Sequence, residues 1–102
     1  MRLILFFDLP VVTKFDWRNY SKFRRFLIND GYLMLQLSVY TRIVFTPDAE
    51  KKHRARLARN LPPRGSIRLL SVTEKQYTAI ERLIGDERFQ EKAVGSSQIL
   101  LF

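Results

Sequence analysis

Asp8 is the residue of this sequence best placed to do chemistry. It ends an almost purely apolar run, residues 2–7, whose length and composition predict a buried strand. Leu9-Pro10 follows directly, so the carboxylate stands where a sheet gives way to a loop. A charge in such a place needs a cation, a hydrogen-bond donor or a metal ion nearby. The structural alternative is a carboxylate that caps the loop or pairs with an arginine.

Basic residues cluster on the helix predicted for residues 15–29. At 100° per residue, Tyr20, Phe23, Phe26 and Leu27 share one face, and most of the basic residues fall on the other. We interpret the basic side as a surface that contacts phosphates without reading sequence, formed by Lys14, Arg18, Lys22, Arg24 and Arg25. A second predicted helix offers a weaker set, Arg54, Arg56 and Arg59. The alternative is a solvated face, although acids are too sparse there for ion pairing to explain the charge.

Composition narrows the function classes. A chain of 102 residues allows one domain, and its net charge of +8 suits a polyanion such as nucleic acid. The alternative is a basic domain whose charge keeps it in solution or binds an acidic partner. The absence of cysteine excludes a disulfide framework and a thiolate zinc site, and fits a cytoplasmic protein. The N-terminal apolar run is too short to span a membrane.

The remaining segments predict the fold. Residues 32–45 indicate two strands with a bend near Ser38, Thr46-Pro47-Asp48 starts a helix that runs to about Asn60, and residues 66–72 alternate like a strand. The order strand, helix, strand, strand, helix, strand predicts an α+β, ferredoxin-like split βαβ fold, with an antiparallel sheet and two helices on one face. We assign residues 1–102 to a single domain with its core in residues 1–85.

The last third is less determined. Residues 73–76 match a capping box and favour a helix up to residue 84, yet residues 77–80 equally fit a strand after a tight turn. Residues 86–97 are polar and predict a loop. Residues 98–102 are apolar, so we expect them to add a strand to this or a second subunit.

The chain resembles the CRISPR-associated protein 2 family, the small subunit of the spacer-acquisition machinery. The likeness covers nearly the whole chain and rests on the order and spacing of its motifs. These are the apolar strand ending in Asp8-Leu9-Pro10, the basic and aromatic helix closing on Gly31, the Gln36-Leu37-Ser38-Val39-Tyr40 strand, and residues 67–77, which look like the version of type II systems.

The resemblance implies a ferredoxin-like symmetric homodimer with a divalent metal held between the two copies of Asp8. Some family members are metal-dependent endonucleases on RNA or DNA, and the family bridges dimers of the CRISPR integrase around double-stranded DNA. It also implies a strand after Gln76-Tyr77, which we adopt over the helix. A hard cation such as Mg²⁺ or Mn²⁺ needs few carboxylates, so one Asp8 per subunit would suffice in a dimer.

Three further side chains have competing interpretations. Ser38 either supports the Asp8 site through a bond to a water or phosphate, or satisfies the backbone at the bend, which we favour. The sole histidine, His53, lies between Ala49 and Leu57 on an apolar stripe, so we interpret it as a packing residue rather than a general base. Tyr32 and Tyr40, with Phe45, either stack on bases or fill the core, as such aromatics more often do.

Two hypotheses therefore compete. In the first, the protein is an Mg²⁺-dependent endonuclease of CRISPR adaptation that uses Asp8. In the second, it is a non-catalytic scaffold that binds duplex DNA and the integrase. A generic RNA-binding module of the same fold is the third and weakest.

Overall fold

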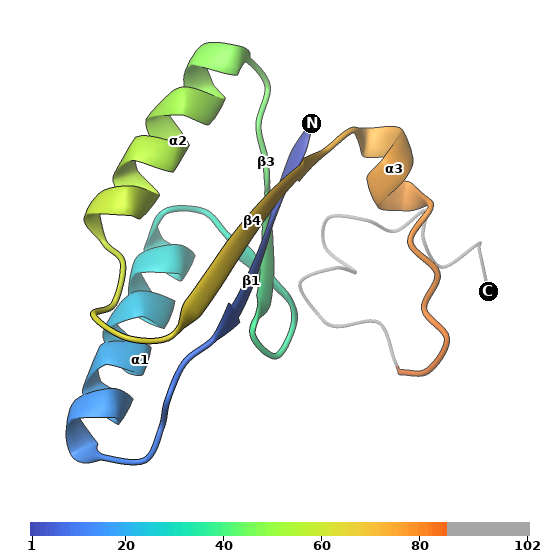
Figure 1. Cartoon of the computed structure of the whole chain (residues 1–102). Coiled ribbons are helices and arrows are strands. Elements are labelled where there is room, and N and C mark those ends of the chain that lie inside the picture. The colour runs from blue at the N-terminus through green and yellow to red at the C-terminus, as the bar shows by residue number, and fades with distance from the viewer. Residues whose placement is uncertain (86–102) are drawn as a thin grey trace.

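The computed structural model describes residues 1–85, and Figure 1 shows its elements. In chain order they are β1 (Arg2–Asp8), α1 (Lys14–Asn29), β2 (Leu33–Gln36), β3 (Val39–Ile43), α2 (Pro47–Arg59), β4 (Ser66–Val72) and α3 (Glu74–Thr78). The predicted order of strands and helices up to residue 72 is confirmed. The predicted loop at 86–97 and strand at 98–102 lie outside the described residues. None of the described helices is long and apolar enough to cross a membrane.

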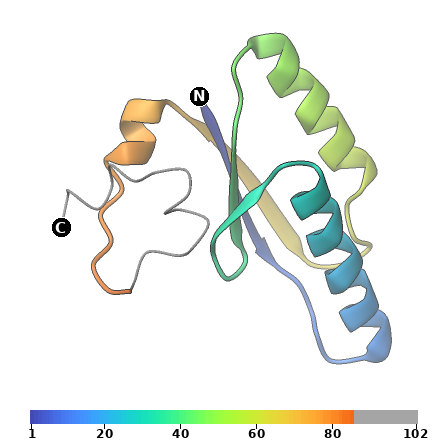
Figure 2. The same ribbon diagram turned by 180° about the vertical axis from the view of Figure 1, so that it is seen from behind.

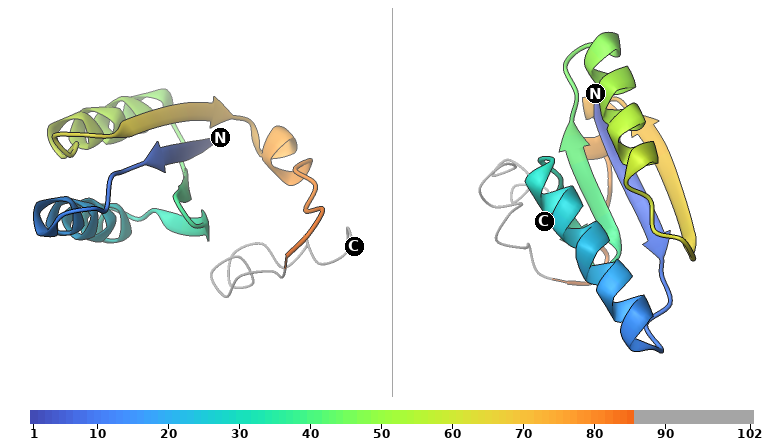
Figure 3. Two further views of the ribbon diagram at one scale, coloured as in Figure 1. Left: turned by 60° about the horizontal axis from the view of Figure 1, so that its bottom comes forward. Right: turned by 90° about the vertical axis from the view of Figure 1, so that its left-hand side faces the viewer.

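The four strands form one antiparallel sheet in the order β2-β3-β1-β4, which is the ferredoxin-like topology. Helices α1 and α2 lie side by side against one face of the sheet (Figures 2 and 3). We call the other side the open face. Because residues paired in register share a face, the open face is formed on β1 and β4 by Ile4, Phe6, Asp8, Ser66, Arg68 and Leu70.

The hydrophobic core lies between the sheet and the two long helices. Leu5 and Phe7 of β1 meet Phe23 and Leu27 of α1 there, together with Leu57 of α2. Helical spacing on α1 and strand alternation on β1 put these side chains on facing surfaces, as predicted. Tyr32 and Tyr40 also belong to this core, and each is 1% exposed, so the interpretation that they fill the core is confirmed. Phe45 does not fill the core, because it is 88% exposed.

Local sequence signals set the boundaries. The Thr46 side chain caps α2 by accepting from the Ala49 amide, and Pro47 follows in the first turn, as predicted. The bend near Ser38 is a turn in which Ser38 adopts a φ of 63°, in the left-handed region. The register of β2 on β3 also shifts between Met34 and Gln36. Residues 32–45 therefore form two strands folded on one another.

The strand expected after Gln76 is wrong for the described residues. The Thr73 side chain accepts from the Gln76 amide while the Gln76 side chain accepts from the Thr73 amide, a complete capping box. This local pairing starts α3, which ends at Thr78 and does not extend to residue 84. The ring of Tyr77 is buried over the Arg2 guanidinium, 4.0 Å from it, and Glu74 pairs with Arg2 at 2.9 Å. Helix α3 therefore covers one end of the open face (Figure 1).

A candidate active site at the end of the first strand

Asp8 is the last residue of β1, and its side chain lies on the open face. Leu5 and Phe7 pack in the core, so the strand pleat turns Phe6 and Asp8 to the opposite side. The Asp8 carboxylate is exposed and makes no hydrogen bond or ion pair with any residue in 1–85. The cost of burial expected from the sequence therefore does not arise. Neither a loop cap nor an arginine pair occupies this carboxylate in the described part of the chain.

Asp8 lines an open hollow of about 300 Å³ on this face of the sheet. The hollow collects side chains from three strands and the turn between β2 and β3, so it depends on the whole sheet being formed. Its polar lining mixes one carboxylate, two hydroxyls and one guanidinium. The lining residues are Phe6, Phe7, Asp8, Ser38, Val39, Ser66 and Arg68.

Ser38 lines the same hollow as Asp8. Its main-chain carbonyl accepts a hydrogen bond of 3.0 Å from the Phe7 amide, which ties the turn to the end of β1. Its left-handed φ of 63° is uncommon for a residue other than glycine and is held by this pairing. The favoured interpretation, a Ser38 side chain that satisfies the backbone at the bend, is wrong for residues 1–85: the hydroxyl makes no hydrogen bond there, and only the main chain of Ser38 pairs with β1.

Two residues of the site, Gly65 and Arg68, were not predicted from the sequence. Gly65 precedes β4 with a φ of +115°, and a Cβ built on it would lie 2.9 Å from the Asp8 carbonyl and 2.5 Å from the Leu9 side chain. Arg68 shares the open face with Asp8 because Ser66, two residues earlier on β4, pairs in register with Asp8. The strand alternation of residues 66–72 was the signal for Arg68, but finding it also required the register of β4 on β1.

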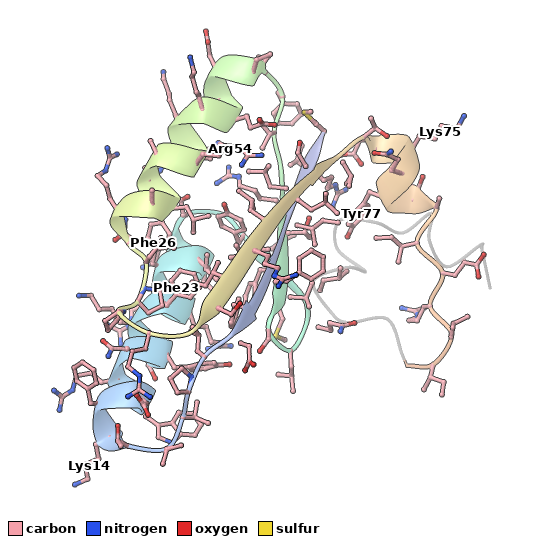
Figure 4. The ribbon with its side chains drawn as sticks, in the orientation of Figure 1. Lys14, Phe23, Phe26, Arg54, Lys75 and Tyr77 are labelled. Carbon is pink, nitrogen blue, oxygen red and sulfur yellow. The ribbon has the colours of Figure 1, made fainter. Side chains whose placement is uncertain are left out.

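The residues predicted to contact phosphate lie on the surface of α1. Lys14, Arg18, Lys22 and Arg25, which we call the basic ridge, are exposed and make no ion pair with residues 1–85. Lys14 extends away from the start of the helix (Figure 4). Arg24 lies to one side of the ridge, because its Nε donates a hydrogen bond of 3.1 Å to the Tyr40 hydroxyl. Arg24 thus joins α1 to β3, although its side chain remains exposed.

Two residues of the second predicted basic set, on α2, form ion pairs with acidic side chains. Arg54 pairs with Glu50 at 3.3 Å one turn earlier, and Arg56 pairs with Asp30 at 2.8 Å. The expectation that ion pairing would not account for this charge is therefore wrong for α2. Asp30 lies at the end of α1 and also accepts from Arg42 through its main-chain and side-chain oxygens. The ion pair between Arg56 and Asp30 was not predicted because the two residues lie far apart in the sequence.

His53 contacts this charged cluster and is a half-buried packing residue, as predicted. Its Nδ1 lies within hydrogen-bond distance of the Arg56 guanidinium. Burial lowers the pKa of His53 below 6.5, and the Arg42 and Arg56 guanidiniums lower it further, against an opposing effect of Asp30. The folded protein therefore favours the neutral imidazole.

Acid is expected to destabilise the fold through His53. Above about pH 6.5 the imidazole is neutral in both states; as the pH falls below that, the unfolded chain takes up the proton first and gains stability relative to the fold. His53→Gln should therefore lose less stability than the wild type between about pH 7.5 and about pH 5.5, measured by urea unfolding at each pH. An equal loss in both proteins would contradict this role.

The donors in the hollow fit a hard divalent cation in kind but not in number. Carboxylate and hydroxyl oxygens are the ligands that Mg²⁺ and Mn²⁺ prefer. Residues 1–85 contain no cluster of three or more acidic, histidine or cysteine side chains able to hold a metal. Asp8 is the one carboxylate in the lining of the hollow, so residues 1–85 of a single chain do not form a complete site for such a cation there.

Comparison with known proteins settles the family. A family model described as "CRISPR associated protein Cas2" matches residues 1–80. This chain belongs to the Cas2 family. A protein of Acidovorax ebreus named "CRISPR-associated endoribonuclease Cas2" is 57% identical over the full length of both chains. One of the same name from Lacticaseibacillus rhamnosus is 46% identical over 86% of this chain and 87% of its own.

The fold agrees with a solved member of the family. The crystal structure of Streptococcus pyogenes Cas2 at pH 6.5 superposes with a TM-score of 0.64, covering 81% of this chain and 99% of that one at 20% identity. The ferredoxin-like fold expected from the order of elements is therefore that of a Cas2 protein. Membership also removes the generic RNA-binding module from the alternatives.

Proposed function

We propose that this protein is a metal-dependent endoribonuclease of CRISPR adaptation that works as a homodimer, with Asp8 of both copies in the site. The observation that carries the proposal is an exposed Asp8 carboxylate, without a partner in residues 1–85, in a hollow of the open face. Curated relatives of this chain carry the name endoribonuclease, which supports RNA as the substrate.

The open face supports pairing with a second copy. Phe6 and Leu70 lie near its middle and are 40% and 50% exposed. Large apolar side chains grouped on an exposed surface mark an interaction site. A two-fold axis through this face would bury both apolar groups against their own copies and bring the two Asp8 carboxylates toward each other, because such an interface uses the same patch twice. The dimer would then supply the acidic ligands that one chain lacks.

The chemistry follows from the donors in the hollow. A bound Mg²⁺ or Mn²⁺ supplies a water activated near neutral pH and neutralises charge on a phosphodiester. The two Asp8 carboxylates would hold that ion, and the Ser38 hydroxyl would orient a water or a phosphate oxygen beside them. The shallow, open form of the hollow admits a nucleic-acid strand rather than enclosing a small molecule.

A cleavage assay tests the proposal. The purified protein is incubated with single-stranded RNA or double-stranded DNA, in Mg²⁺, in Mn²⁺ and in EDTA. RNA cleavage that requires an added divalent ion supports the endoribonuclease. No cleavage, or the same cleavage in EDTA, would overturn it.

A second function has a structural observation in its favour. The basic ridge lies on α1, on the helix-covered side of the sheet, whereas Asp8 lies on the open face. A duplex bound along the ridge would not need Asp8. We therefore propose that the same homodimer binds double-stranded DNA and the CRISPR integrase as a scaffold in the cytoplasm, whether or not it cleaves RNA.

Removing charge from the basic ridge is expected to weaken DNA binding and its salt dependence together. Each phosphate contact contributes about 0.9 to the slope of log affinity against log salt. The double variant Arg18→Gln/Lys22→Gln should therefore reduce that slope by about 2, measured by fluorescence anisotropy with duplex DNA. The matched control is Arg54→Gln/Lys52→Gln on α2, where Arg54 is already paired with Glu50. Equal slopes for wild type and ridge variant would exclude the ridge.

A further inference from the structure

We infer that Arg68 binds the phosphate that is cleaved beside Asp8. The inference rests on the proposed endoribonuclease and names the group that meets its substrate. Arg68 lies on β4 and points to the open face, directly opposite Phe6 in the register of β4 on β1. Both Arg68 and Asp8 line the same hollow.

The sheet fixes the spacing between the two groups. Ser66 pairs with Asp8, and Arg68 is the next residue of β4 on the same face, about 6.6 Å further along the strand. That separation leaves room between the carboxylate and the guanidinium for a phosphate that contacts both an Asp8-bound ion and the arginine. A guanidinium binds two phosphate oxygens at once through its fork of N–H donors, which a lysine does not do.

The Arg68 guanidinium has no partner within the described chain. It makes no hydrogen bond or ion pair with residues 1–85, in contrast to Arg2, which pairs with Glu74 at the other end of the open face. When a second copy covers the apolar middle of this face, a charge left without an anion would be costly. The site therefore needs an anion at Arg68, and a substrate phosphate provides one.

Hydrolysis of the phosphodiester explains why a contact between Arg68 and the phosphate would raise the rate. In hydrolysis the water oxygen forms a bond to phosphorus, the bond from phosphorus to the leaving ribose oxygen breaks, the water proton passes to solvent, and the leaving oxygen takes up a proton. Negative charge is spread over the non-bridging oxygens as this occurs. A donor placed at those oxygens stabilises the transition state more than the ground state. Arg68 would thus act mainly on kcat.

Kinetics of two Arg68 variants and one control test this role. Arg68→Gln should lower kcat for single-stranded RNA by about twentyfold with a smaller change in KM, the effect of losing a charged hydrogen bond. Arg68→Lys, which keeps the charge but not the fork, should recover part of that loss. Lys51→Gln removes one positive charge from an exposed position of α2 and should leave kcat unchanged. A kcat for Arg68→Gln equal to that of the wild type would overturn the inference.

Binding without turnover separates this inference from the proposed function. In ¹⁵N-labelled wild type in EDTA, the Arg68 Nε–H signal, identified by its loss in Arg68→Lys, should shift saturably as a five-nucleotide RNA is added. That result would stand even if no preparation cleaves RNA. If the Arg68 Nε–H signal does not shift when RNA is added, the inference is wrong. A signal that shifts in Asp8→Asn without RNA would also overturn it, because it would mark Arg68 as the partner of Asp8 across the dimer.

Discussion

Replacing Asp8 by Asn is expected to reduce metal-dependent RNA cleavage by about a thousandfold, or about 4 kcal/mol of transition-state stabilisation. The amide keeps the size of the side chain but removes the charge that holds a divalent ion. Because the carboxylate is exposed and makes no bond with residues 1–85, its loss should leave the fold intact. The measurement is the single-turnover cleavage rate at saturating RNA, with thermal unfolding as the check on folding.

The control for Asp8→Asn is Asp48→Asn, which removes an exposed charge from the first turn of α2. That variant should cleave RNA at the wild-type rate. Binding of Mn²⁺, followed by the loss of its free electron-spin signal, should also be weakened by Asp8→Asn and not by Asp48→Asn. Cleavage retained in Asp8→Asn would mean that the activity comes from elsewhere, and the scaffold would become the leading function.

Gly65→Ala is expected to cost about 3 kcal/mol of folding stability and to impair the site as well. Part of the cost comes from a side chain at a φ of +115°, about 1–2 kcal/mol. The rest comes from a methyl group forced against the Asp8 carbonyl at 2.9 Å and the Leu9 side chain at 2.5 Å. Relief of that contact must move the end of β1, so metal binding should weaken with stability. Urea unfolding measures the first effect and Mn²⁺ binding the second.

The chain offers a matched control for Gly65. Gly85 has a φ of +114°, yet the nearest described atom to its Cβ position is 3.9 Å away. Gly85→Ala therefore carries the conformational cost without the contact. The difference between the two variants isolates the close approach of β4 to the end of β1. If both lose the same stability, the contact with Asp8 contributes nothing and the site does not depend on it.

Most of the fold could be predicted from sequence because its signals are local. Thr46 and Pro47 determine the start of α2 within one turn of helix. A bend was predictable in residues 32–45 because a stretch of fourteen residues that favour a strand is longer than one strand usually is. The prediction failed at residues 77–80 because a strand expected from the family likeness was placed above the local signal of a capping box. There the backbone followed the side chains of Thr73 and Gln76.

The site was only half predictable, since its members come from separate elements. Asp8 and Ser38 could be identified from their places at a strand end and a bend. Arg68 became visible only through the register of β4 on β1, which no local pattern specifies. The pair between Arg56 and Asp30 escaped for the same reason, because it joins α2 to the end of α1.

The central position of β1 has a consequence for how the protein is made. Strand β1 pairs with β3 and, along its whole length, with β4, which is made more than fifty residues later. During synthesis the backbone edge of β1 that pairs with β4 therefore stays open until residue 72 has been made. Such distant pairing slows folding and exposes apolar surface to aggregation. Nascent chains truncated before β4 should accordingly require a chaperone, and the hollow at Asp8 forms only after β4 has been made.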